Sequence, residues 1–163
     1  MKKKLQLDVI RNYNYTISVI DPHGRELIFR DIRGSDLEFL DQVFKYDPEE
    51  DKRGETRLSF NDVCDILNKF LVEPSGFDVN KLTKPTVHKV FTIVRDNILC
   101  NYIPKVNWLK CCYGIQNSSF VNLEQMESVP MSKFVVMAEI HKEAVDQTSE
   151  IDTPVDVEGS SGD

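Results

Sequence analysis

The sequence predicts an α+β fold, in which a short antiparallel β-hairpin is followed by about five packed helices. Three observations support this prediction. Apolar and polar residues alternate near the N-terminus, apolar residues recur at helical spacing from residue 35 onward, and the C-terminal segment is acidic and poor in large apolar side chains. We therefore expect one domain over residues 1–142, with the hairpin at about 13–32 and the helices at about 35–142, and a disordered acidic tail over 143–163.

The hairpin is predicted from alternating side chains on both sides of a turn. The apolar positions of its first strand are Tyr13, Tyr15, Ile17 and Val19. The turn Asp-Pro-His-Gly follows at residues 21–24, where Pro fixes φ and Gly tolerates a positive φ. Leu27 and Phe29 continue the apolar face, and a looser alternation over 5–12 permits a leading strand. Because a two-stranded hairpin is marginal alone, we expect helices to cover its apolar face.

The first three helices are predicted from capping residues that precede apolar stripes. Ser35, with Glu38 three residues later, forms a capping-box pattern before the first stripe. Ser59 is expected to cap the second helix. Thr83 and Pro85 are expected to open the third, because proline fits a first helical turn.

The remaining helices are predicted in the C-terminal half. Pro104 ends the third helix and starts a fourth, which Gly114 is expected to close. A short helical turn begins at one of the serines at 118–119, and a last helix runs from Met131 toward His141. Together with the first three helices, these segments complete the predicted helical part of the domain.

Charge and hydropathy exclude several classes of protein. The net charge of −7 lies in residues 143–163, which hold seven acids and no Lys or Arg, so that residues 1–142 hold 20 acids and 20 bases. A neutral body with an acidic tail lacks the basic face of a nucleic-acid-binding protein. No apolar run approaches the roughly 18 residues needed to span a membrane, and no apolar stretch follows the basic start at 1–4. We expect an intracellular protein without nucleic-acid or membrane partners.

Catalytic, metal and cofactor motifs are not visible in the sequence. The seven glycines never form a Gly-x-Gly phosphate loop, and the three histidines fall in three different predicted elements. Cys111 and Cys112 are adjacent, unlike paired zinc ligands, and with Cys64 and Cys100 they are expected to be buried free thiols. We predict a protein that is not an enzyme and has no metal or cofactor, with a small cysteine enzyme as an alternative that thiol reactivity would test.

A calcium- or ligand-responsive regulatory module is a second alternative. The charged run 46–57 is predicted to be a loop, and segment 47–62 with its flanking helices resembles a calcium-binding helix-loop-helix. Calcium requires oxygen ligands at set loop positions and a glycine at the sharp turn. With Leu58 at the hydrophobic eighth position, Arg53 falls on a ligand position and Thr56 on the glycine position. A surface loop is the first prediction, and a rise in thermal stability on adding calcium would favour the alternative.

Two groups of residues are candidates for contacts with a protein partner. Met-rich helical surfaces form adaptable grooves, although core packing explains most such residues. The candidate partner-binding residues are Trp108, Tyr113, Phe120, Met126, Met131, Phe134 and Met137. Arg25, Arg30 and Arg33 around the second strand are expected to form local ion pairs, with docking of an acidic partner as the alternative.

Four segments carry a resemblance to a known family. They are the strand Glu-Leu-Ile-Phe-Arg-Asp-Ile at 26–32, the helix start Arg-Gly-Ser-Asp-Leu-Glu-Phe-Leu at 33–40, the run Trp-Leu-Lys-Cys-Cys-Tyr-Gly at 108–114, and Val-Pro-Met-Ser-Lys-Phe at 129–134. Over residues 15–142 this arrangement resembles tailed-phage tail assembly chaperones and the related T4-type baseplate hub proteins. The resemblance implies no catalytic residue.

The resemblance also implies a role and a set of partners. The protein would be a non-enzymatic factor of phage tail or baseplate assembly, acting as a chaperone or as a minor structural component. It would hold apolar helical segments of a viral tail protein, namely the tape measure, a hub protein or a baseplate subunit. It would be a late protein found in the cytoplasm of the infected host cell or in the virion.

Overall fold

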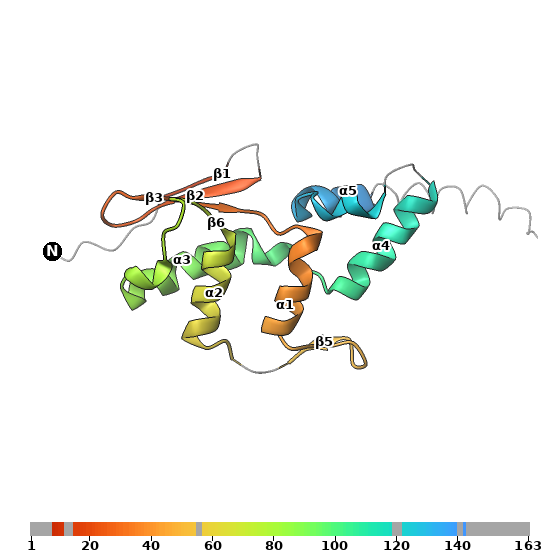
Figure 1. Cartoon of the computed structure of the whole chain (residues 1–163), viewed down its shortest axis with the longest axis horizontal. Coiled ribbons are helices and arrows are strands. Elements are labelled where there is room, and N and C mark those ends of the chain that lie inside the picture. The colour runs from red at the N-terminus through yellow and green to blue at the C-terminus, as the bar shows by residue number, and fades with distance from the viewer. Residues whose placement is uncertain (1–7, 12–14, 55–56, 119–121, 140–141, 143–163) are drawn as a thin grey trace, which may run out of the picture.

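The α+β prediction is confirmed by the computed structural model, in which antiparallel strands are followed by helices (Figure 1). The structure describes residues 8–11, 15–54, 57–118, 122–139 and 142. The sheet, α2 and α3 lie at one end of the molecule, α4 and α5 lie at the other end, and α1 lies between them (Figure 1). The predicted tail at 143–163 lies outside the described residues.

The predicted hairpin forms the centre of a four-stranded sheet with the order β1-β2-β3-β6. Strand β1 spans Asp8–Arg11, β2 spans Thr16–Ile20 and β3 spans Glu26–Arg30, all antiparallel. The turn is held by Asp21, whose Oδ1 accepts hydrogen bonds from the backbone N–H groups of two turn residues at 2.8 and 2.9 Å. The leading strand permitted by the sequence is thus present.

Strand β6 (Leu71–Glu73) corrects the sequence prediction, which has the second helix simply stopping at this point. Helix α2 (Phe60–Phe70) continues directly into β6, and Leu71 pairs with Phe29 on β3. An apolar run of this kind suits a helix or a strand equally well. Pairing with the exposed edge of β3 decides the outcome here.

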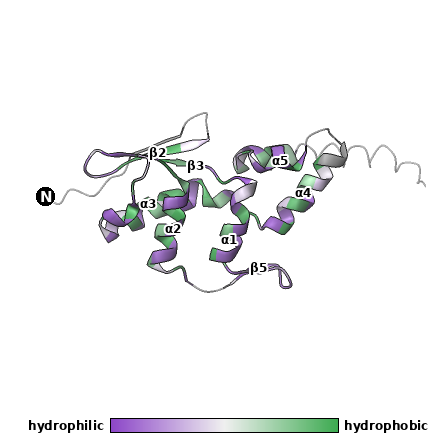
Figure 2. Cartoon of the chain, in the orientation of Figure 1, coloured by the Kyte–Doolittle hydropathy of each residue, from purple (hydrophilic) through white to green (hydrophobic). Residues whose placement is uncertain are grey.

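Helices α2 and α3 begin where the sequence predicts. Ser59 accepts a hydrogen bond from Asp62 N at 3.1 Å, and the Asp62 carboxylate accepts one from Ser59 N, which completes a capping box. Helix α3 (Lys84–Asn97) is capped by Thr83 and has a proline in its first turn. A 3-10 turn, η2 (Val79–Lys81), joins the two helices. Both helices are amphipathic, and Figure 2 shows hydrophobic and hydrophilic residues on each.

The first helix begins later than predicted. Gly34–Asp36 forms a 3-10 turn, η1, and α1 spans Leu37–Val43. The capping box is closed by Asp36, which accepts a hydrogen bond from Arg33 N at 2.8 Å, and not by Ser35 and Glu38. Arg30 explains the shift, because its guanidinium donates two hydrogen bonds to the same carboxylate at 2.7 and 2.9 Å.

The charged run predicted as a loop at 46–57 contains a small strand pair in its described part, residues 46–54. Its two-residue strands β4 (Tyr46–Asp47) and β5 (Lys52–Arg53) pair as a small antiparallel ribbon. The Tyr46 hydroxyl donates to the Asp51 carboxylate at 2.5 Å across the tip. Lys45, just before β4, and Asp51, just before β5, adopt positive φ, which is uncommon for residues other than glycine.

After α3, the described residues form η3 (Leu99–Asn101), α4 (Lys105–Ser118), α5 (Leu123–Glu127) and a helix over residues 131–139. Gly114 does not close the fourth helix, since α4 continues to Ser118. One isolated glycine costs a helix only about 1 kcal/mol relative to alanine, so packing on both sides carries the helix past it. The short helix α5 is capped by Asn122.

One continuous hydrophobic core joins both ends of the molecule. Phe29 of β3 and Phe70 of α2 are fully buried beneath the sheet, and Leu37 and Leu40 of α1 are buried beside them. Trp108 of α4 extends this core toward the C-terminal helices. The helices therefore cover the apolar face of the sheet, as the marginal stability of a bare hairpin requires.

Candidate partner-binding groove

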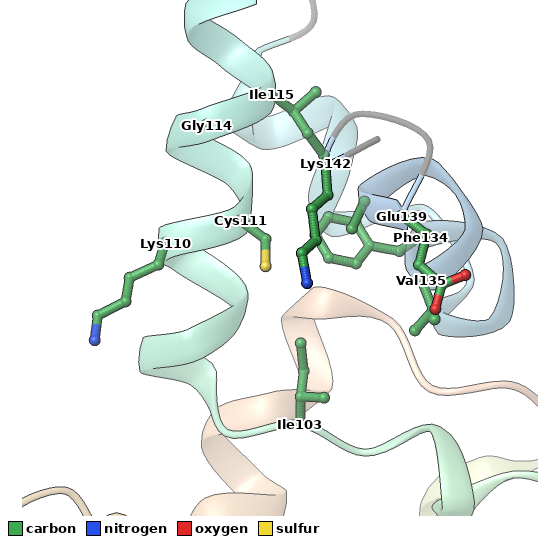
Figure 3. Close-up of a pocket in the computed structure, with 10 residues that line it drawn as sticks. Ile103, Lys110, Cys111, Gly114, Ile115, Phe134, Val135, Glu139 and Lys142 are labelled. Atoms are coloured by element: carbon green, nitrogen blue, oxygen red, sulfur yellow. The ribbon is translucent and has the colours of Figure 1, made fainter. Parts of the chain in front are cut away.

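An apolar groove of about 520 Å³ lies between α4 and the helix 131–139, and we call it the α4 groove (Figure 3). Its lining is almost entirely apolar and comes from both helices, from the segment before α4 and from Lys142. The lining residues are Ile103, Lys110, Cys111, Gly114, Ile115, Phe134, Val135, Ala138, Glu139 and Lys142. A concave apolar site of this size is typical of ligand and peptide binding.

Trp108 positions the α4 wall of the groove. Its indole is 1% exposed, and its ring centroid lies 5.8 Å from that of Phe134 on the facing helix. On the other side it packs against Gly34, where a Cβ atom would lie only 2.2 Å from Cζ2 of the indole. The glycine thus lets α4 approach η1 closely, and the tryptophan sets the spacing of the two groove walls.

Asp31 positions the opposite wall. Its buried carboxylate accepts hydrogen bonds from Ser132 N at 2.9 Å and from Ser132 Oγ at 2.5 Å, and so caps the helix 131–139. The same carboxylate accepts from Ile32 N at 2.9 Å and from Asn101 Nδ2 at 3.2 Å. Met131 N adds a hydrogen bond to Ile32 O at 2.6 Å. One carboxylate therefore joins β3, η3 and the C-terminal helix.

Charged residues lie at the rim of the groove. Figure 3 shows the Cys111 side chain pointing from α4 into the space, with the stem of Lys142 lying between the two helices. Lys110 points away from the groove on the outer side of α4, and Glu139 lies on the facing helix. Lys142 is therefore the cation beside the space, and it favours an apolar segment that carries an acidic residue near Lys142.

The structure separates the seven predicted partner-binding residues. Four are core residues with at most 1% exposure: Trp108, Met126, Met131 and Phe134. Tyr113 is exposed on α4, Met137 is half-buried, and Phe120 lies outside the described residues. Of the six that the structure describes, only Phe134 lines the groove. The four buried residues of the set pack in the core that supports the groove walls, and their side chains have almost no surface that a partner could contact.

Sequence reasoning missed the smaller residues that line the groove. Cys111 and Ile115 are spaced i, i+4 on α4, and Val135 and Ala138 are spaced i, i+3 on the facing helix. Ile115 also belongs to the buried core, whereas Cys111, Val135 and Ala138 are partly buried and widen the apolar stripes beside core positions. The signal in the sequence that could have revealed the groove is that the apolar faces of α4 and of the helix 131–139 are wider than their contact with the core.

Three carboxylates in the described part of the acidic loop 47–62 accept local hydrogen bonds. Asp47 accepts from Glu49 N at 2.9 Å, Asp51 accepts from the Tyr46 hydroxyl, and Asp62 caps α2. In the part of the chain that the structure describes, no three His, Cys, Asp or Glu side chains gather as metal ligands. The calcium alternative gains no support from this geometry.

Two of the three arginines around the second strand, Arg25 and Arg30, form the local ion pairs that the sequence predicts. Arg30 makes a two-point ion pair with the buried Asp36 and lies 5.0 Å from the ring centroid of Phe70. Arg25 lies 3.8 Å from the Asp21 carboxylate and 4.6 Å from the Phe77 ring centroid. Arg30 and Arg25 therefore stabilise the turn and the start of α1.

The four cysteines are free thiols, as predicted, but only two are buried. Burial raises the pKa of Cys112 to about 12, and burial also raises the pKa of Cys64, with a smaller effect from Asp78. Cys100 is exposed and Cys111 is half-exposed in the groove. The two buried thiols are protonated at neutral pH and unsuited to nucleophilic attack.

We expect N-ethylmaleimide at about pH 8 to modify Cys100 and Cys111 of the native protein quickly, and Cys64 and Cys112 more than about 100-fold more slowly. The reason is that the buried pair is both shielded from the reagent and held as thiols. Peptide mass spectrometry after timed quenching measures the four rates, and Cys111→Ser resolves the adjacent pair. Modification of Cys112 at the rate of Cys100 would contradict the burial described here.

Comparison of the chain with protein-family models, with curated proteins and with solved structures finds no match. Each helix within the described ranges is too short or too polar to cross a lipid bilayer. The site itself must therefore carry the functional argument.

Proposed function

We propose that this protein is a non-enzymatic factor of phage tail or baseplate assembly that binds another tail protein through the α4 groove. The observation that carries the proposal is the groove, an apolar cavity of about 520 Å³ whose two walls are fixed by Trp108 and Asp31. The resemblance of segments 26–40, 108–114 and 129–134 to tail assembly chaperones and baseplate hub proteins supports the viral role. The last two segments lie in or beside the groove walls.

The occupant we propose is an apolar helical segment of a tape measure, hub or baseplate subunit, with an acidic residue near Lys142. An amphipathic helix fits such a groove through anchors spaced at i, i+3 or i+4 and i+7. The Phe134 ring and the small side chains of Cys111 and Ala138 leave room for such anchors. Lys142, whose stem lies between the two helices, supplies a charge that complements the acidic residue.

Replacing Val135 with glutamate is expected to reduce capture of the tail partner at least tenfold, because a carboxylate would then lie inside an apolar groove. The matched control is Val136→Glu on the same helix, since Val136 is 54% exposed and does not line the groove. Tagged wild type and both variants would be used to capture proteins from phage-infected host cells, with quantitative mass spectrometry of what is retained.

The proposal requires tape-measure, hub or baseplate proteins with the wild type and with Val136→Glu, and their loss with Val135→Glu. Thermal unfolding of all three proteins shows whether Val135→Glu is folded, and Ala138→Glu provides a second groove variant. Equal capture by folded Val135→Glu and wild type would remove the groove as the binding site. Absence of any tail protein from the wild-type capture would remove the assembly role.

A further inference from the structure

A second cavity lies away from the α4 groove, and we call it the arginine cavity. Its volume is about 880 Å³, and it is formed where the segment after β5 meets α2, α3 and η3. Three arginines line it, Arg53, Arg57 and Arg95, together with apolar walls that include Phe44 and Phe91. It therefore combines positive charge with apolar surface, in contrast to the α4 groove.

Among the described residues that line this cavity, arginines outnumber carboxylates. Arg95 is paired with Asp96 at 3.1 Å, and both line the cavity. Arg53 lies over the rings of Phe44 and Tyr102, at 4.8 and 5.8 Å from their centroids, which holds its guanidinium in place without neutralising it. Within the described residues, neither Arg53 nor Arg57 has a carboxylate within ion-pair distance.

The chemistry of the cavity selects a ligand with both carboxylates and aliphatic side chains. Guanidinium groups bind carboxylates through paired hydrogen bonds. The apolar wall formed by Phe44, Leu58 and Phe91 gains from burying aliphatic groups. A small inorganic anion would leave most of an 880 Å³ cavity and its aromatic wall without contacts.

The chain itself contains a segment of this composition. Residues 150–158 read Glu-Ile-Asp-Thr-Pro-Val-Asp-Val-Glu, with acids at every even position except the proline and with apolar side chains at three odd positions. In an extended chain, alternate side chains point to opposite sides, so one side would carry four carboxylates and the other would carry Ile151, Val155 and Val157. Segment 143–163 holds no Lys or Arg that would compete for the carboxylates.

We infer that the arginine cavity binds the acidic segment 150–158 of this chain, with its carboxylates on Arg53 and Arg57 and its aliphatic side chains on apolar lining residues such as Leu58 and Phe91. Charge complementarity, and a lining that combines arginines with apolar side chains as the segment combines acids with aliphatic side chains, carry this inference. It is independent of the proposed function, since the arginine cavity shares no lining residue with the α4 groove.

Hydrogen exchange on the full chain tests the inference. In the wild type at low salt, amides of 150–158 are expected to exchange about fivefold to tenfold more slowly than in Arg53→Gln/Arg57→Gln, because two charge-assisted contacts are lost. Raising NaCl to about 0.5 M should remove the protection in the wild type, since the contacts are exposed to solvent. The matched control is Lys81→Gln/Lys133→Gln, which removes two exposed charges that do not line the cavity.

Each outcome of the exchange experiment decides the inference. Protection that is lost in the arginine variant and kept in the lysine variant supports binding in the arginine cavity. Equal exchange in the wild type and the arginine variant overturns it. Protection that survives in the arginine variant but is lost in Val135→Glu also overturns it, because the segment would then occupy the α4 groove. Amides in α2 and α3 report whether each variant stays folded.

Discussion

Replacing Trp108 with alanine is expected to lower the free energy of unfolding by about 3–5 kcal/mol, the largest effect of a single substitution in this chain. The indole is 1% exposed and fills the space between η1 and the helix 131–139, in contact with Gly34 and near Phe134. Its removal leaves a cavity that rigid helix packing cannot close. Urea unfolding followed by circular dichroism at 222 nm measures the change, since it does not depend on the lost tryptophan.

The close contact between Gly34 and Trp108 provides a sharper check on the same packing. Gly34→Ala alone should be destabilising, because its Cβ would lie 2.2 Å from indole Cζ2. Trp108→Phe removes that part of the ring. It costs no hydrogen bond, because the buried Nε1 has no partner among the residues that the structure describes. The double variant should therefore be more stable than the sum of the single effects predicts. Additive changes in the free energy of unfolding would show that the two substitutions act independently and would contradict the close contact between Gly34 and Trp108.

The parts of the fold that the sequence predicts correctly have local causes. The β2–β3 turn follows from residues 21–24, and the starts of α2 and α3 follow from Ser59 and Thr83. In each case the deciding hydrogen bonds join residues within four positions of one another. Such contacts can be read from spacing alone.

The parts that sequence reasoning missed depend on contacts between distant segments. Leu71 becomes a strand residue because it pairs with Phe29, and nothing near Leu71 in the sequence requires this. The start of α1 is displaced to Leu37 because Arg30 holds Asp36. Propensity is a weak guide wherever tertiary contacts compete with it.

The candidate site shows the same limit in another form. Reasoning from the sequence selected large apolar side chains such as Trp108 and Met131 as partner-binding residues. A large apolar side chain mainly predicts burial, however, and both of these residues lie in the core. The groove is lined instead by smaller side chains beside core positions, such as Cys111 next to the buried Cys112. Identifying it requires knowing how α4 and the helix 131–139 face each other, which depends on residues about 100 positions apart.

Asp31 provides that long-range contact, and Asp31→Ala is expected to lower the free energy of unfolding by about 3 kcal/mol. The substitution removes four hydrogen bonds from one buried carboxylate and leaves Ser132 and the Asn101 amide without that acceptor. Chemical denaturation measures the total change in the free energy of unfolding. Ser132→Ala is the matched control, since it removes only the Oγ contact, and it should cost about 1 kcal/mol.

The loss of stability in Asp31→Ala should also differ from one part of the chain to another. Because Asp31 caps the helix 131–139, amides in that helix should exchange faster in the variant, while those of α2 should change only with global stability. On the proposed function, a folded Asp31→Ala protein should also capture less tail partner, since one wall of the α4 groove is no longer held against β3. A uniform rise in exchange across all helices would instead mean that the carboxylate stabilises the whole fold without positioning the groove.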